Sequence, residues 1–320
     1  MSEISIACDG RDTPAGFLAK AQASETGGAR AFWIANHLFQ RDPISQAAIA
    51  LERTQGLTVA LMALTPFTVH PIQAAMAAAT LDEYYPGRVV LCLGVGAPAD
   101  LKAAAIEVPK PLRPMREALE LARALLSGEQ VTYQGETYQA RARRLASGHR
   151  AVPLVLAASG PQMLELAGNL ADGVLISAGT SLEFIKRSLE HVHRGAKGRR
   201  VSTHALVYSA VDAVESRAHD RMRRMLAILL RGAHHKPNLD LGGSVLDQEA
   251  VNRAVLAEDW ATAEALITDD IVRRHAASGT PAQVRAAFDR YHAAGLDEII
   301  ASGARDATQV ADIMAAAASR

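Results

Sequence analysis

Two histidines stand directly after apolar segments that we expect to be strands. His37 lies in ANHLF and His70 lies in TVHP. Histidine changes charge between about pH 5 and 8, so an imidazole at a strand end can accept or donate a proton near neutral pH. Capping or filling the start of the next helix explains either histidine as well. We expect His37 to be the proton-transfer candidate, with Asn36 orienting a ligand because an amide does not exchange a proton.

Two turns that contain glycine and serine precede expected helices. In AASGPQMLELAG, Ser159 is expected to cap a helix whose first residue is Pro161, and Gly160 lets the backbone turn. One strand later, Gly179 opens a similar turn before the next helix. The start of a helix presents free N–H groups and the positive end of its dipole, which suit a phosphate. Capping alone accounts for one such turn, but two on the same face favour a ligand that carries phosphate.

The segment LCLGVGAPA contains Gly94 and Gly96 after an expected strand, which is the minimum of a dinucleotide-binding fingerprint. Pro98 interrupts the helix that this fingerprint requires, so we expect a flexible turn that lets a ring or a backbone approach closely. The sequence shows no pattern of residues typical of a metal site or of a hydrolase. His191 and His193 lie on an expected amphipathic helix, and no G-x-S-x-G motif surrounds a serine.

Short runs rich in valine, isoleucine and leucine recur along the chain and alternate with longer helical patterns. Near-continuous apolar strands that alternate with helices indicate a parallel sheet covered on both faces. Eight such units predict a single-domain (β/α)8 barrel over residues 1–320, with an open doubly wound sheet as the alternative. The expected strands are 4–8, 31–35, 58–64, 88–94, 153–158, 173–177, 204–210 and 298–302, and the expected helices are 14–27, 44–55, 72–84, 112–127, 161–171, 182–195, 213–232 and 306–318.

Two stretches exceed the needs of a minimal barrel. Residues 97–111 and 130–139 form one of them, and Gly135 in the second part favours a small β-hairpin. Residues 233–280 form the other, an insertion with extra helices at about 248–276. Barrel enzymes place lids and specificity loops in such inserts.

The composition describes a globular chain with no polyanionic partner. Its 320 residues are 49% hydrophobic and 21% charged, and 34 basic residues balance 34 acidic ones, which argues against nucleic-acid binding. We expect a cytoplasmic protein, because Cys8 and Cys92 lie in apolar runs and no signal-peptide pattern opens the chain. Residues 54–81 are uncharged, but Pro66 and Pro71 interrupt them, so we expect no membrane span.

Five longer passages together resemble the bacterial luciferase-like superfamily, in that family's order and over nearly the whole chain. Within it, the chain is most similar to the deazaflavin-dependent branch around 5,10-methylenetetrahydromethanopterin reductase, with which it shares the proline-containing stretch 110–129 and the block from Gly279. The passages are 32–39 (FWIANHLF), 66–96 (PFTVHPIQAAMAAATLDEYYPGRVVLCLGVG), 125–138 (LLSGEQVTYQGETY), 152–177 (VPLVLAASGPQMLELAGNLADGVLIS) and 279–302 (GTPAQVRAAFDRYHAAGLDEIIAS).

The resemblance implies a barrel that binds coenzyme F420 or FMN at the carboxyl ends of its strands and that forms a homodimer or a larger homo-oligomer. It also implies a non-proline cis peptide bond around residues 62–64. The ring of the cofactor is expected against the ends of strands 2 to 4, and its phosphate against loops at 158–161 and 177–180. The residues expected to bind the cofactor are Leu64, Thr65, Gly94, Gly96, Ala97, Ala158, Ser159, Gly160, Ser177, Gly179 and Thr180.

Relatives in that branch carry a carboxylate at the end of strand 1, an Asp-His pair after strand 2 and an acid after the G-x-G turn. The matching positions here hold Ala7 or Cys8, then Asn36 before His37, and then Ala97, and we expect Asp9 to substitute for the first acid by a small shift in register. His37, Asn36 and Asp9 are therefore the expected catalytic residues. We expect an oxidoreductase that transfers a hydride through a flavin or deazaflavin in the barrel, and coenzyme F420-dependent reduction of the methylene-pterin type is the leading hypothesis within that class. A monooxygenase that uses reduced FMN and O2 is the first alternative, and a cofactor-binding homologue without catalysis is the second.

Overall fold

Eight parallel strands close into a barrel in the computed structural model, which describes residues 3–177 and 179–319. The order round the barrel is β1, β2, β3, β4, β7, β8, β9 and β11, and the pairing of β11 with β1 closes it. This arrangement confirms the predicted (β/α)8 barrel and excludes the open sheet. The strands are β1 (Glu3–Cys8), β2 (Ala31–Ala35), β3 (Thr58–Leu64), β4 (Val89–Leu93), β7 (Leu154–Ala158), β8 (Gly173–Ile176), β9 (Ser202–Val211) and β11 (Glu298–Ser302).

Side chains at alternate positions of the strands fill the inside of the barrel, because successive residues of a strand point to opposite faces. A separate, larger apolar layer lies between the strands and the outer helices. The apolar cluster inside the barrel consists of Ala7, Ala31, Trp33, Ala60, Met62, Cys92, Val155, Leu175 and Ile300.

A buried polar cluster, termed the barrel floor, lies among these side chains toward the amino ends of the strands. Its centre is Glu298, which is 2% exposed. The carboxylate accepts hydrogen bonds from the Ser5 hydroxyl and from Trp33 Nε1 at 2.9 Å, and it lies 2.8 Å from His204 Nδ1. Each polar group of the floor thus has a partner, which is the condition for burying charge in a protein interior.

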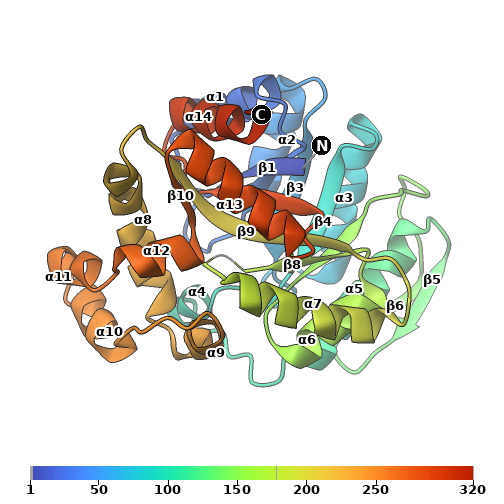
Figure 1. Ribbon diagram of the computed structural model, residues 1–320. Helices are drawn as coiled ribbons and strands as arrows, with labels where there is room; N and C mark the ends of the chain where they lie inside the picture. Colours follow the sequence, from blue (N-terminus) through green and yellow to red (C-terminus); the bar gives the residue numbers. More distant parts are fainter. Residues whose placement is uncertain (1–2, 178, 320) are drawn as a thin grey trace.

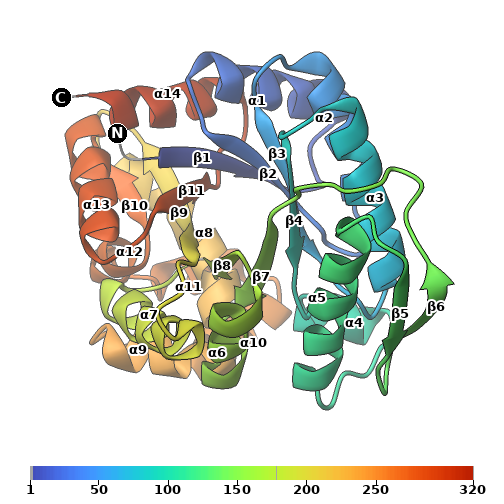
Figure 2. The ribbon, with the colours of Figure 1, turned by 90° about the vertical axis from the view of Figure 1, so that its right-hand side faces the viewer.

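Helices cover the outside of the barrel (Figure 1, Figure 2). Side-chain caps begin several of them: Thr13, Asp42 and Asp306 each accept a hydrogen bond from an amide of the first turn. The helices of the barrel are α1 (Pro14–Thr26), α2 (Pro43–Arg53), α3 (Pro71–Tyr84), α5 (Leu112–Leu126), α6 (Pro161–Leu170), α7 (Leu182–Ala196), α8 (Glu215–Leu230), α13 (Pro281–Ala293) and α14 (Ala307–Ala318).

Three further features extend the barrel. Strands β5 (Val131–Gln134) and β6 (Gln139–Arg143) form the predicted hairpin, and α4 (Pro98–Ala103) is a short helix after β4. Between α8 and α13 lies the predicted insertion. It consists of η1 (Ala233–His235), α9 (Lys236–Leu241), α10 (Gln248–Leu256), α11 (Trp260–Ala265), α12 (Asp269–His275) and the short strand β10 (Ala277–Gly279), which pairs with β9.

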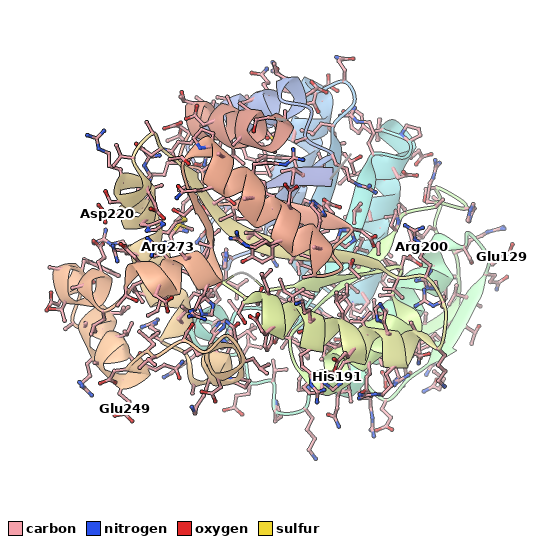
Figure 3. All side chains as sticks on the ribbon, viewed as in Figure 1. Glu129, His191, Arg200, Asp220, Glu249 and Arg273 are labelled. Carbon is pink, nitrogen blue, oxygen red and sulfur yellow. The ribbon has the colours of Figure 1, made fainter. Side chains whose placement is uncertain are left out.

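The insertion is tied firmly to α8. Arg273 Nε on α12 lies 3.0 Å from Glu215 Oε1 on α8, and Figure 3 labels Arg273 on α12 and Asp220 on α8. Arg223 of α8 forms an ion pair with Asp269 at the start of α12. Both ribbon views place α4, α9 and α10 toward the lower end of the molecule, opposite α1 and α14 (Figure 1, Figure 2).

Across the described part of the chain, no helix combines the length and the apolar character that crossing a bilayer requires. The uncharged stretch 54–81 folds as β3, a turn and most of α3. Cys8 and Cys92 are buried and form no disulfide bond, and burial raises the pKa of both thiols.

Candidate active site

The carboxyl ends of the strands, here termed the barrel mouth, are bordered by small side chains. Ala35, Ala63, Gly94 and Ala157 occupy these positions on or directly after β2, β3, β4 and β7. A Cβ added to Gly94 would lie 2.9 Å from Ala63 Cβ and 3.2 Å from Ala157 Cβ. Any larger residue at position 94 would therefore push its neighbours aside or project into the mouth.

The turn after β4 requires a second glycine, because Gly96 has a φ of +97°, which side chains rarely adopt. The Thr65 hydroxyl donates a hydrogen bond of 2.8 Å to the Val95 carbonyl and fixes this turn against the end of β3. The side chains of Leu64 and Thr65 are buried. A ligand would therefore contact the backbone of these two residues rather than their side chains. Ala97 is half-buried and stands as the N-cap of α4.

Asn36 joins the end of β2 to the end of β3. Its backbone N–H donates to the Met62 carbonyl, and its side-chain Nδ2 donates to the Ala63 carbonyl at 3.3 Å. The peptide bond between Met62 and Ala63 is cis, as the resemblance implied. The Asn36 amide therefore holds the backbone at the edge of the mouth.

His37 pairs with an acid that was not predicted from the sequence. Its Nδ1 lies 3.1 Å from Asp100 Oδ2, and the same oxygen accepts a hydrogen bond from the Leu38 amide at 3.2 Å. Asp100 lies on α4, shortly after the G-x-G turn, three residues beyond Ala97, the position that the resemblance matches to the acid of the relatives. Helix α2 is capped by Asp42, so His37 is not a helix cap. The half-buried pair leaves His37 Nε2 as the nitrogen that can meet a ligand.

His70 caps a helix, which is the structural alternative that the sequence left open for both histidines. Its Nδ1 accepts a hydrogen bond from the Ile72 amide at 3.2 Å and caps α3. Its ring contacts Tyr138 of the hairpin edge to face. Because its Nδ1 is committed to the helix and its ring to the hairpin, we assign no chemistry to His70.

Asp9 stands directly after β1 and pairs with Arg11. Arg11 Nε lies 2.9 Å from Asp9 Oδ2, and the Arg11 amide donates to Oδ1 at 3.0 Å. Burial alone would raise the pKa of Asp9, but the hydrogen bonds and charge of Arg11 outweigh it and lower that pKa. Asp9 is thus ionised at neutral pH, a state in which it can accept a proton but has none to donate, and its catalytic role stays a prediction. Burial raises the pKa of the nearby Tyr208 to about 12, so its hydroxyl keeps its proton.

The start of α6 is exposed and has no side-chain cap. Gly160 is the N-cap, with Pro161 at the first helical position, so Ser159 lies one residue too early to cap the helix as predicted. Ala158 is the buried last residue of β7. A Cβ added to Gly160 would meet no atom within 4 Å. The free amides of this helix start are therefore accessible, which suits an anionic group.

The loop before α7 is held by two buried side chains of the insertion. Asn238 Nδ2 donates to the Gly179 carbonyl at 2.7 Å, and Asn238 Oδ1 accepts from the Ser181 amide at 2.8 Å. His275 Nδ1 lies 2.8 Å from the same Gly179 carbonyl. Gly179 has a φ of +66°, and a Cβ added there would lie 2.3 Å from Leu229 Cδ2, so this position requires glycine.

Thr180 is buried in the same loop, and residue 178 lies outside the described residues. The Thr180 hydroxyl donates to the Ser177 carbonyl at 3.3 Å, and the Tyr291 hydroxyl donates to the Thr180 carbonyl at 3.1 Å. Ser177, directly after β8, is half-buried. Of the predicted phosphate-binding residues here, Ser177 therefore offers its side chain more readily than Thr180.

Charged groups away from the barrel mouth are less suited to binding a ligand. A hollow of ≈ 390 Å³ lies at the opposite end of the barrel, between the end of α5 and the segments before β7 and β8. Its charged side chains are already paired, Arg123 with Asp172 at 3.0 Å and Arg150 with Glu83 at 3.4 Å. Within residues 3–177 and 179–319, no three His, Cys, Asp or Glu side chains gather where they could hold a metal ion. The barrel mouth is therefore the candidate active site.

Known proteins are similar to this chain over most of its length. A family model described as luciferase-like monooxygenase matches residues 4–298. The 5,10-methylenetetrahydromethanopterin reductase of Archaeoglobus fulgidus is 30% identical over 280 residues, which cover 84% of this chain and 83% of that protein.

Two solved structures share the fold. The structure of coenzyme F420-dependent tetrahydromethanopterin reductase from Methanopyrus kandleri has a TM-score of 0.91 at 22% identity, covering 98% of this chain and 97% of that one. An F420-dependent secondary alcohol dehydrogenase in complex with an F420-acetone adduct has a TM-score of 0.81 at 20% identity, covering 98% and 96%.

Proposed function

The chain belongs to the luciferase-like monooxygenase family and is thus an oxidoreductase of that class, and we propose that it is a coenzyme F420-dependent reductase of a small organic substrate. The observation that carries the proposal is the His37–Asp100 pair at the barrel mouth. It supplies a proton-transfer group at a place where the sequence had suggested that the acids were lost. The 5,10-methylenetetrahydromethanopterin reductase relative makes a methylene-pterin the first substrate class to test.

The barrel mouth fits a planar ring with a phosphate-bearing tail. Gly94 and its alanine neighbours leave the ends of β2 to β4 without bulky side chains. The uncapped start of α6 at Gly160 opens on free space at the same end of the barrel. Helix α7 begins beside it, because β7 and β8 are neighbouring parallel strands. Backbone amides of these two helix starts would hold the phosphate, and Ser177 would add a hydroxyl.

His37 and Asp100 divide the work of proton transfer. When bound, the deazaflavin supplies a hydride, and reduction of the substrate also requires one proton. A carboxylate accepts hydrogen bonds, so Asp100 favours the form of His37 in which Nδ1 carries a hydrogen. His37 Nε2 is then free to take up a proton and to release it to the substrate. Asp100 also stabilises the positive charge that the ring carries while it holds that proton.

Other residues of the mouth orient rather than react. Asn36 holds the end of β3 through the Ala63 carbonyl, and Thr65 holds the turn that contains Gly96. The ionised Asp9 places a negative charge at the mouth, which Arg11 partly neutralises.

Titration under anaerobic conditions tests the proposal most simply. Purified protein is mixed with oxidised coenzyme F420 or with FMN, and binding is followed by the change in cofactor fluorescence. We expect saturable binding of F420 that is tighter than that of FMN. Tighter binding of FMN, together with substrate-dependent O2 consumption by the FMN-loaded protein, would favour the monooxygenase. Flat titrations with both cofactors would contradict the proposal.

A further inference from the structure

Two buried side chains of the insertion form hydrogen bonds with the loop 179–181. Asn238 on α9 and His275 at the end of α12 both bind the Gly179 carbonyl, at 2.7 Å and 2.8 Å. Both are buried, at 1% and 0% exposure. Two donors that converge on one carbonyl at a helix start fix the direction in which that peptide group points.

We propose that Asn238 and His275 are positioning residues that hold the loop 179–181 in its phosphate-binding shape, which makes the insertion a fixed clamp instead of a mobile lid. The inference rests on the proposed function, because that function assigns the cofactor phosphate to this loop.

The hydrogen on the His275 ring follows from its partners. A carbonyl oxygen only accepts hydrogen bonds, so the Nδ1 that lies beside the Gly179 carbonyl carries the hydrogen. Burial lowers the pKa of His275, although the hydrogen bond to Gly179 acts in the opposite direction, so the ring is neutral at neutral pH. Nε2 then accepts a hydrogen bond of 2.8 Å from the Ser244 hydroxyl. Ser244 thus orients the ring toward the loop.

The side-chain amide of Asn238 forms hydrogen bonds with two peptide groups of the loop. Its Nδ2 donates to the Gly179 carbonyl while its Oδ1 accepts from the Ser181 amide at 2.8 Å. Ser181 is the N-cap of α7 and accepts a hydrogen bond from the Phe184 amide. The Asn238 side chain therefore sets the position of the first turn of α7 as well as that of the loop.

The direction of the Gly179 carbonyl determines the direction of the following Thr180 N–H, which could bind a ligand. In a planar trans peptide group, the carbonyl and the following N–H point in opposite directions. Because the Gly179 carbonyl points to Asn238 and His275, the Thr180 N–H points away from the insertion. That N–H is then available to an anion at the start of α7, where the helix dipole also favours negative charge. Release of the carbonyl would let the peptide group rotate and lose this donor.

A pair of variants at one position separates positioning from general stability. In His275→Asn, the side-chain Nδ2 stands near the place of the imidazole Nδ1 and can still donate to Gly179. In His275→Gln, the amide extends to the place of Nε2 near Ser244 and leaves the Gly179 carbonyl without that donor. Both variants lose the ring, so their losses of packing are similar. His234→Gln is the matched control, because His234 is exposed on the same insertion.

Two measurements are made on all four full-length proteins. The first is the dissociation constant of coenzyme F420 and of FMN. The second is amide hydrogen exchange in residues 179–186 without cofactor, with thermal unfolding as the control for stability. We expect His275→Gln to weaken cofactor binding by about tenfold and to speed exchange in this segment, since it removes one buried hydrogen bond. His275→Asn and His234→Gln should stay within about threefold of wild type.

Equal dissociation constants and equal exchange in the Asn and Gln variants would overturn the clamp. If wild-type protein binds neither cofactor, the proposed function fails instead. The exchange measurement then still decides whether His275 holds the loop, since it needs no ligand.

Discussion

Replacing Glu298 at the barrel floor tests how the interior of this barrel is stabilised. In Glu298→Ala, the Trp33 indole N–H, the Ser5 hydroxyl and the His204 ring lose their shared partner inside the protein. In Glu298→Gln, the side chain keeps its length, so the amide oxygen can still accept from Trp33 and Ser5. The two variants therefore differ in hydrogen bonding, while both remove the negative charge.

The expected magnitudes follow from burial. Glu298 is 2% exposed, so its interaction with His204 is little screened by water. A buried donor left without its acceptor costs about 1–3 kcal/mol, and Glu298→Ala removes the acceptor of Ser5, Trp33 and His204, so we expect a loss of at least about 3 kcal/mol in its free energy of unfolding. Glu298→Gln should lose only about 1 kcal/mol at neutral pH, because most hydrogen bonds of the floor persist.

The contribution of Glu298 to the free energy of unfolding is expected to decrease as the pH falls. Burial alone would raise the pKa of Glu298, but the hydrogen bond and charge of His204, with Ser5 and Trp33, outweigh it and lower that pKa. A carboxylate whose pKa falls on folding stabilises the native state above its unfolded pKa, and this contribution disappears as pH falls through the folded value. Urea unfolding from about pH 7 to about pH 3 should therefore show less acid destabilisation in Glu298→Gln than in wild type. An unchanged acid slope, or a Glu298→Ala variant as stable as wild type, would refute this reasoning.

Three further outcomes are expected. His37→Ala should reduce turnover by a factor on the order of 10²–10⁴ with a much smaller change in cofactor affinity, and equal turnover at saturating cofactor and substrate would leave His37 without a catalytic role. Gly160→Trp should weaken cofactor binding strongly while the fold survives, because a side chain there enters open space. Gly56→Trp is its matched control, since it also has open space around it and precedes β3 at the other end of the barrel; equal affinities in both variants would place the phosphate elsewhere. Light scattering should give at least twice the mass of one chain, and a monomer across a wide concentration range would contradict the expected homo-oligomer.

Most of the barrel was predictable because buried parallel strands leave a strong signal in the sequence. The eight runs of valine, isoleucine and leucine need no long-range information to be recognised. Helix α13 was not predicted, although Thr280 and Gln283 form a capping box that marks its start. The prediction that Ser159 caps α6 is wrong by one residue: proline favours the first helical position, so Pro161 implies Gly160 as the cap.

The site was predictable only in part, because its partners lie far apart in the chain. His37 and Asp100 are separated by 63 positions, and the fold brings them together because the segment after β2 and helix α4 after β4 lie at the same end of the barrel. Asn238 and His275 come from short helices of the insertion, and nothing in their spacing indicates that both turn toward Gly179. Local patterns identified the strand ends, whereas the pairing of side chains across those ends required the fold.

The most direct test of the account follows hydride transfer itself. Chemically reduced coenzyme F420 is mixed anaerobically with the protein and 5,10-methylenetetrahydromethanopterin, and the return of the oxidised cofactor is followed by its absorbance. We predict reoxidation that depends on both protein and substrate, that proceeds without O2 and that is strongly slowed in His37→Ala. Reoxidation that requires O2, or none with this and related methylene-pterins despite cofactor binding, would contradict the proposed reductase.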